Sequence, residues 1–258
     1  MGGSASAPPA VLQPGGMHVR EAPALASIVK LCPTLMHYPH SKMKTPARRL
    51  SLVAFAFLLP VIAAGVEPLL GKRGTLLLEE NFDGAALPKG WLKNTGELSV
   101  KEGVLRASEL PAQNHVGAFR KALPLQDAVV QLEFKLEGAT TFHLGFDPAP
   151  GQLKKQGHLF SVIITENAWT LTEHNDKADL ASKNVVHAKA ATNFPRGQWF
   201  KLSLEMKGND VVASIEGKEP LRATAKDFHV KKPGLVFRAG RKAGQEVLID
   251  NVKVWELK

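Results

Sequence analysis

The chain has 258 residues, room for one large or two small domains, and its apolar fraction of 44% can supply a sizeable core. The whole chain has a formal charge of +9, from 33 basic and 24 acidic residues. Residues 1–65 hold six of these basic residues and one of the acidic ones, so residues 66–258 keep 27 against 23, a formal charge of +4. Those bases are dispersed and form no concentrated stripe, so we expect no nucleic-acid partner.

The N-terminal region has the composition of an extension followed by a targeting segment. Residues 1–42 are rich in Gly, Ala, Pro and Ser, and are predicted to be either disordered or an over-extended gene start upstream of Met43. A short basic stretch begins at Met43, an uncharged apolar run covers 50–64, and small residues at its end suit a cleavage site. Residues 43–65 therefore predict a secretory signal peptide, which implies export to the periplasm or the extracellular space.

Two alternatives stay open for the apolar run 50–64, namely an uncleaved N-terminal anchor and a buried core helix. The run is short for a membrane span, which needs about 20 apolar residues, and no membrane association is expected after cleavage. Residues 66–75 are predicted to be a linker. The single cysteine, Cys32, precedes the run, so the exported part has no thiol for a disulfide, a nucleophile or a metal site.

Residues 76–258 are predicted to form one all-β domain. Short apolar or alternating segments recur about every 8–12 residues, separated by Gly, Pro, Asn and Asp. The clearest alternation lies in 128–137, where every second residue from Val130 to Leu136 is apolar, as in an antiparallel strand with one buried face. The segments predicted to be strands are 75–82, 97–100, 104–108, 116–121, 128–137, 140–147, 159–165, 169–173, 199–206, 211–215, 235–239 and 246–257.

This series of strands predicts a two-sheet antiparallel β-sandwich or jelly roll, because many short strands without a long amphipathic helix need a second sheet to cover each apolar face. We expect the first segment, 75–82, and the last, 246–257, to lie close together. Three of the four tryptophans, Trp91, Trp199 and Trp255, are expected in the core because they lie at strand starts or within alternating runs.

Several short motifs resemble a known family. The residues Asn81-Phe-Asp-Gly84, Gly90-Trp91 and the stretch 97–105 are similar to the opening of the bacterial 3-keto-disaccharide hydrolase domain. The stretches 195–202 and 249–255 resemble the last two strands of the concanavalin A-like lectin/glucanase superfamily, which contains that domain, laminin-G-like modules and family 16 glycoside hydrolases. The resemblance spans the predicted domain and implies two curved sheets, with a concave face on which relatives bind carbohydrate.

The sequence does not predict a catalytic residue. Family 16 glycosidases carry Glu-x-Asp-x-(x)-Glu on one strand, and the nearest match here, 131–137, has Lys135 at the position of the aspartate. Glu133 and Glu137 would lie roughly 13 Å apart along a strand, whereas a retaining pair needs about 5 Å and an inverting pair up to about 9.5 Å. No Ser-His-Asp order, phosphate loop or nucleotide fingerprint is present.

A ligand site is predicted around one tryptophan. Acids and a histidine cluster in sequence near Trp169, and sugar sites combine an aromatic plane with carboxylates or amides that hold hydroxyl groups. The alternative is a polar hairpin with Trp169 in the core. The predicted ligand-binding residues are Trp169, Glu166, Glu173, His174 and Asp176.

A structural calcium ion is the metal that the sequence favours, and no organic cofactor is expected. Glu80, Asp83 and Asp250 supply hard oxygen ligands on the two strands expected to be neighbours, and the resemblance implies calcium in that area. The alternative is that the two aspartates cap turns. The histidines after residue 65 show no i,i+2 or i,i+4 pairs, so no zinc site is predicted.

The pattern thus predicts an exported, monomeric, carbohydrate-binding β-sandwich without catalysis, whose partner is a glycan. The first alternative is a hydrolase of 3-keto-disaccharides or other glycosides, as the resemblance implies. The second is an extracellular structural or protein-interaction module of the same fold.

Overall fold

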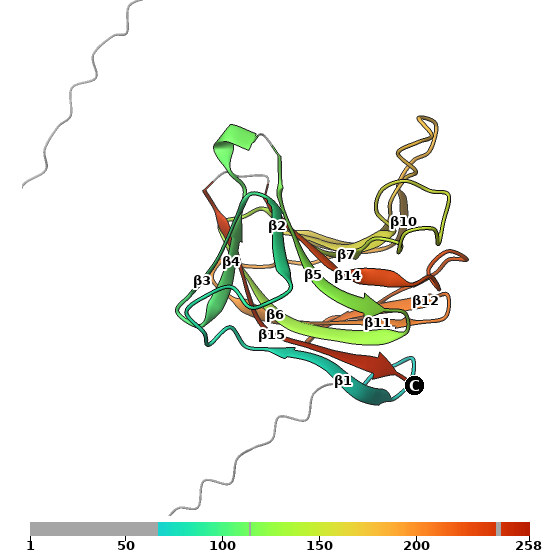
Figure 1. Ribbon diagram of the computed structural model, residues 1–258, viewed down its shortest axis with the longest axis horizontal. Coiled ribbons are helices and arrows are strands. Elements are labelled where there is room, and N and C mark those ends of the chain that lie inside the picture. The colour runs from blue at the N-terminus through green and yellow to red at the C-terminus, as the bar shows by residue number, and fades with distance from the viewer. Residues whose placement is uncertain (1–66, 114, 241–243) are drawn as a thin grey trace, which may run out of the picture. The chain divides into compact units, whose positions relative to one another are not determined.

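The computed structural model describes residues 67–113, 115–240 and 244–258. The predicted signal peptide and N-terminal extension lie outside the described residues. The described part consists of antiparallel strands and one short 3₁₀-helix, η1 (Pro111–Gln113), arranged in two sheets (Figure 1). The prediction of an all-β, two-sheet antiparallel sandwich is confirmed.

The first sheet, sheet A, contains the first and last strands of the domain. β1 (Arg73–Glu80) pairs antiparallel with one half of β15 (Glu246–Leu257), as expected. The other strands lie in the order β13 (Leu221–Thr224), β12 (Asp210–Ile215), β11 (Trp199–Lys207), β6 (Ala128–Glu137), β15, β4 (Val104–Ser108) and β3 (Glu97–Lys101).

The second sheet, sheet B, packs on the inner face of sheet A and lies above it in the view of Figure 1. Its middle strands follow one another in the chain as hairpins, and β14 enters between β7 and β5. The order is β10 (Val185–Ala191), β9 (Ala168–Glu173), β8 (Phe160–Thr165), β7 (Thr141–Phe146), β14 (Lys232–Gly240), β5 (Gly117–Leu125) and β2 (Trp91–Thr95).

Aromatic side chains from both sheets meet in the core. The alternation predicted for β6 is confirmed, because its apolar residues are buried while the polar ones between them face outward. The Phe134 ring of β6 lies 5.3 Å from the Phe142 ring of β7 and 5.6 Å from that of Phe200. Phe142 in turn lies 6.4 Å from Phe237 of β14. Large apolar rings of this kind contribute most of the burial that holds two sheets together.

The segment before β1 is attached to sheet A. Glu205, which is 2% exposed, accepts hydrogen bonds from the backbone N–H groups of Leu69 and Leu70 at 2.7 and 2.8 Å. Burial raises the pKa of Glu205, and these two bonds partly oppose that shift. The strand starts at Arg73, inside the stretch predicted to be a linker, so the described part of that stretch is folded onto the domain.

Three strands escaped the sequence analysis. β2 was not among the predicted strands, β13 has four residues, and β10 has no clean alternation because all of its residues are partly or fully exposed. β10 and β13 are edge strands with a neighbour on one side, where the apolar pattern is weakest. In the described part of the chain, no helix has the length and apolar character needed to span a membrane.

One buried charge stands out in the core. Lys232 is 1% exposed, and its Nζ donates hydrogen bonds to the carbonyl oxygens of Phe228 and Val230, both at 2.8 Å. Burial lowers its pKa to about 8, because the charged form loses its hydration. The ammonium group joins the 228–230 turn to the start of β14.

We expect Lys232→Met to change how stability depends on pH. Between about pH 8 and pH 10.5 the unfolded chain binds more protons at this position than the folded chain, so the wild type gains stability as pH rises. Urea unfolding near the two ends of that range should show the wild type gaining about 3 kcal/mol relative to the variant. The exposed neighbour Lys231 provides the control as Lys231→Met, which should follow the wild type. Parallel curves for Lys232→Met and wild type would contradict the assignment.

Candidate functional site

Two pockets lie on opposite outer faces of the sandwich. One, of about 630 Å³, lies on the outer face of sheet A, and the other, of about 360 Å³, on the outer face of sheet B. Size alone does not identify a functional site, so we compare the two pockets by the chemistry of the side chains that line them.

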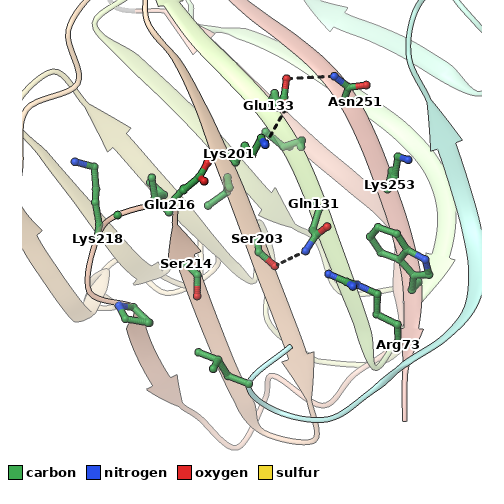
Figure 2. Close-up of a pocket in the computed structure, with 17 residues that line it drawn as sticks. Arg73, Gln131, Glu133, Lys201, Ser203, Ser214, Glu216, Lys218, Asn251 and Lys253 are labelled. Carbon is green, nitrogen blue, oxygen red and sulfur yellow. Dashed lines mark hydrogen bonds and ion pairs between the residues drawn. The ribbon is translucent and has the colours of Figure 1, made fainter. Parts of the chain in front are cut away.

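The pocket on sheet A is lined by polar groups that already bind one another (Figure 2). Glu133 accepts a hydrogen bond from Asn251 at 3.2 Å and lies 4.0 Å from the Lys201 ammonium. The indole ring of Trp255 is covered by the Arg73 guanidinium, 4.9 Å from its centroid. The one aromatic ring of this pocket is thus already stacked with a cation, which leaves less of its face for a sugar.

The pocket on sheet B has a different chemical character. In Figure 1 the loop with η1 rises on one side of this face, and the loops around residues 150 and 180 rise on the other. Strands β2, β5 and β14 supply the floor, and residues 158 and 174–184 supply one wall. The lining residues are Asn94, Thr95, His115, Val116, Ala118, Arg120, His158, His174, Asn175, Lys177, Asn184, Val236 and Arg238.

Asp147, just after β7, connects two of the lining residues. Its Oδ2 accepts hydrogen bonds from Nη2 and Nε of Arg120 at 3.0 and 3.3 Å, and its Oδ1 lies 2.5 Å from Nδ1 of His158. Burial by itself would raise the pKa of Asp147, but His158 and Arg120 outweigh it and hold that pKa below its usual value. Arg120 also donates to Oδ1 of Asn94 at 2.5 Å, so β2, β5 and the loop after β7 are connected.

His174 lies beside this network and is neutral. Its Nε2 is 2.8 Å from Oγ of Ser161, and its ring centroid lies 5.6 Å from that of His158. Burial lowers its pKa to about 3, and the positive charge of Arg238 adds to the shift. A neutral imidazole offers one N–H donor and one acceptor, a pair that suits a sugar hydroxyl.

A glycine makes room for the contact between Ser161 and His174. Gly145 is paired with Ser161 across β7 and β8, and a Cβ at this position would lie 2.2 Å from Oγ of Ser161. Any larger residue would therefore displace the serine hydroxyl that positions His174.

Arg238 is the second guanidinium of the pocket. It is paired with His143 of β7 and with Ala118 of β5, while Arg120 is two residues away on β5, so the two arginines are diagonal neighbours on one face. Burial lowers the pKa of Arg238; Asp147 opposes that shift, and Arg120 reinforces it. Within the described residues, Arg238 has no hydrogen-bonding partner, whereas Arg120 takes one oxygen of the nearby carboxylate.

The ligand site predicted around Trp169 does not form, because the Trp169 side chain is 1% exposed and lies in the core. Its ring offers no face to a sugar, so the alternative of a core tryptophan is correct. Glu166 is held by Arg196 at 2.6 Å, and Glu173 lies 3.1 Å from His187. Of the five predicted residues only His174 lines the pocket on sheet B, while Asp176 caps its own loop by accepting hydrogen bonds from the N–H groups at 156 and 178.

The expected core positions of the other tryptophans hold in part. Trp91 is 5% exposed and lies 5.3 Å from Phe237. Trp199, in contrast, is 37% exposed at the start of β11, with the Lys135 ammonium over its ring at 5.4 Å. Trp199 pairs with Lys135 of β6, which faces outward, so strand alternation places the tryptophan on the outer face of sheet A.

The three residues predicted to bind calcium are not gathered into one ligand set. In the described part of the chain no three His, Cys, Asp or Glu side chains lie close enough to hold a metal ion. Asp250 accepts a hydrogen bond from the N–H of Asn251 and Asp83 accepts one from Asn81, while Glu80 caps the N–H of Phe82. Burial raises the pKa of Asp250, and the charges of Glu133 and Asp83 add to the shift. The carboxylates of Glu80, Asp83 and Asp250 thus do not form a calcium site in this arrangement, and calcium binding by the protein remains a prediction.

Sequence reasoning missed four residues that define the pocket on sheet B, namely Arg120, Asp147, His158 and Arg238. Each lies in or beside an apolar segment, without a spacing that sets it apart. The signal that could have found Arg120 and Arg238 is their outward position in alternating strands. Their meeting depends on the pairing of β5 with β14, which joins residues more than 100 positions apart.

The fold is a two-sheet antiparallel β-sandwich, and solved structures of carbohydrate-binding and glucanase domains share it. No protein-family model and no curated protein sequence matches the chain. One similar solved structure is the carbohydrate-binding module CBM66 from Bacillus subtilis, with 10% identity over 65% of this chain and 96% of that chain and a TM-score of 0.51. A second is SCLam, a non-specific endo-β-1,3(4)-glucanase from family GH16, with 13% identity over 71% of this chain and 91% of that chain and a TM-score of 0.53. A third is a protein with a galectin-like fold from Bacillus subtilis, with 16% identity over 72% of this chain and 98% of that chain and a TM-score of 0.52. At these identities the likeness establishes the fold, and function has to be argued from the site.

We expect Asp147→Asn to be destabilised by about 2 kcal/mol at neutral pH, because it removes the charge that Arg120 and His158 share. The folded pKa of Asp147 is lowered, so its contribution is present above the unfolded value and is lost as pH falls through the folded value. The wild type and the variant should thus converge in acid. Urea unfolding from about pH 7 down to about pH 2 measures this. Asp179→Asn, which keeps its turn hydrogen bond, should match the wild type throughout, and a constant gap at Asp147→Asn would contradict the charge assignment.

Proposed function

We propose that the domain binds carbohydrate in the pocket on the outer face of sheet B and does not itself cleave it. The observation that carries the proposal is the lining of this pocket, in which guanidinium, imidazole and amide groups of Arg120, His174 and Asn184 lie on one face. Sugars present many hydroxyl groups that both donate and accept, so a lining of this kind can hold several at once.

The lining also supports binding without hydrolysis. None of the described residues that line the pocket is an aspartate or a glutamate. Most glycoside hydrolases use two carboxyl groups, about 5 Å apart in a retaining enzyme and up to about 9.5 Å in an inverting one. The adjacent carboxylate, Asp147, is already bound to Arg120 and His158 and has a lowered pKa, which does not suit a general acid.

Export fits this role. Residues 43–65 have the features of a secretory signal peptide, and a monomer released into the periplasm or the extracellular space would meet glycans there. The solved structures that share the fold include a carbohydrate-binding module and glucanases of family GH16, so the fold is compatible with sugar ligands in both binding and catalytic proteins.

One observation favours the alternative of a hydrolase. Asp147 holds Nδ1 of His158, a residue that lines the pocket, and a carboxylate–histidine pair can activate a water molecule as general base. This alternative needs a leaving group that departs without a carboxylic acid partner. The other alternative, a protein-interaction module, would use the same face without sugar.

A glycan-array screen on the full chain, with release of reducing sugar measured in the same samples, separates these functions. Binding without release is the expected result. Release that disappears in His158→Ala would establish the hydrolase instead. Neither binding nor release would refute both and leave the interaction module.

The two pockets can be distinguished by one pair of variants. Asn94→Ala, in the pocket on sheet B, removes an exposed amide and should weaken binding of the best array ligand about fivefold, the value of a typical hydrogen bond. Lys201→Ala, in the pocket on sheet A, removes an exposed side chain of similar accessibility and should leave the affinity within about twofold. Isothermal titration calorimetry measures both, and the reverse order would place the ligand on sheet A.

A further inference from the structure

The pocket on sheet B has more positive than negative charge at its floor. Arg120 and Arg238 are diagonal neighbours on paired strands, and Asp147 is the carboxylate that faces them. The oxygens of that carboxylate are bound by Arg120 and by His158. The neutral His174 contributes no charge to the balance, and the Lys155 ammonium, which donates to the carbonyl oxygen of His174, is paired with Glu173 at 3.6 Å.

Among the described residues, the guanidinium of Arg238 therefore has no hydrogen-bonding partner in the pocket. It is partly buried, its pKa is lowered because the charge has lost hydration, and none of the described residues accepts a hydrogen bond from it. A buried charge in this state gains free energy from any anion that reaches it, because the desolvation cost has been met on folding. Lys177, exposed at the rim of the same pocket, extends the positive charge toward solvent.

We propose that this pocket recognises an acidic sugar, and that Arg238 binds the oxyanion group of that sugar, a carboxylate or a sulfate ester. The inference rests on the proposed function and specifies its ligand class. A guanidinium presents two parallel N–H groups that match the two oxygens of either group. Arg120 is kept in place beside it by Asp147 and Asn94, so it shapes the site and adds charge without losing its own partners.

The electrostatics also define what the pocket rejects. A basic or amine-bearing sugar would meet two guanidinium groups and be repelled. A neutral sugar would bind through the amides and imidazoles but leave Arg238 unpaired. The acidic sugar should therefore bind more tightly than its neutral counterpart, by an amount that decreases as salt screens the charges.

The test is calorimetry of the full chain with three oligosaccharides of equal length: a neutral gluco-oligosaccharide, an oligogalacturonate with carboxylates and a sulfated galactan oligosaccharide. At low ionic strength we expect at least one acidic ligand to bind about tenfold tighter than the neutral one, in line with a charge-assisted hydrogen bond. The acidic ligand that binds tighter identifies the oxyanion.

Arg238→Gln should weaken binding of the acidic ligand more than binding of the neutral one, and so remove most of that preference. The matched control is Arg222→Gln, which removes the same charge from an exposed position on β13 of sheet A and should keep the full preference. If Arg238→Gln does not fold, as judged by its melting curve, the exposed rim variant Lys177→Gln serves instead and should reduce the preference about threefold and flatten its salt dependence.

The outcomes separate the inference from the proposed function. Equal binding of neutral and acidic ligands, or a preference that persists in Arg238→Gln, would overturn the inference and leave carbohydrate binding intact. Binding of none of the three sugars, together with a negative array, would overturn both.

Discussion

The packing of aromatic rings between the two sheets is the constraint on which the rest of the structure depends. Phe142 of β7 and Phe237 of β14 reach into the core, where they meet Phe134 of β6. Because strand residues alternate between faces, the residues that follow these two rings, His143 and Arg238, must face outward on sheet B. The core thereby fixes where the polar groups of the pocket lie.

A single carboxylate then sets the charge of that pocket. Asp147 binds Arg120 and His158, and none of the described residues accepts a hydrogen bond from Arg238. Desolvation keeps His174 neutral, so its imidazole can both donate a hydrogen bond to a hydroxyl group and accept one from it. The face thus combines a fixed positive charge with uncharged polar groups, a combination that suits a ligand rich in oxygen.

The larger pocket, on sheet A, illustrates why volume is a poor guide. Several of its groups are engaged with one another, as Glu133 is with Asn251 and Lys201, and Arg73 covers the ring of Trp255 (Figure 2). A ligand there would have to replace these contacts before gaining its own. The fold occurs in carbohydrate-binding modules and in glucanases alike, so the distinction between binding and catalysis has to come from the residues of the site.

The all-β sandwich and the alternation of β6 could be predicted from the sequence alone, because apolar periodicity and turn residues are local signals. The first and last strands were expected to lie close together, and β1 pairs with β15. The sequence could not determine the site. The ring of Trp169 is in the core, and the acids near it in sequence bind partners elsewhere. Only the tertiary structure brought Arg120 beside Arg238, since strand register joins residues far apart in the chain and no local pattern encodes that pairing.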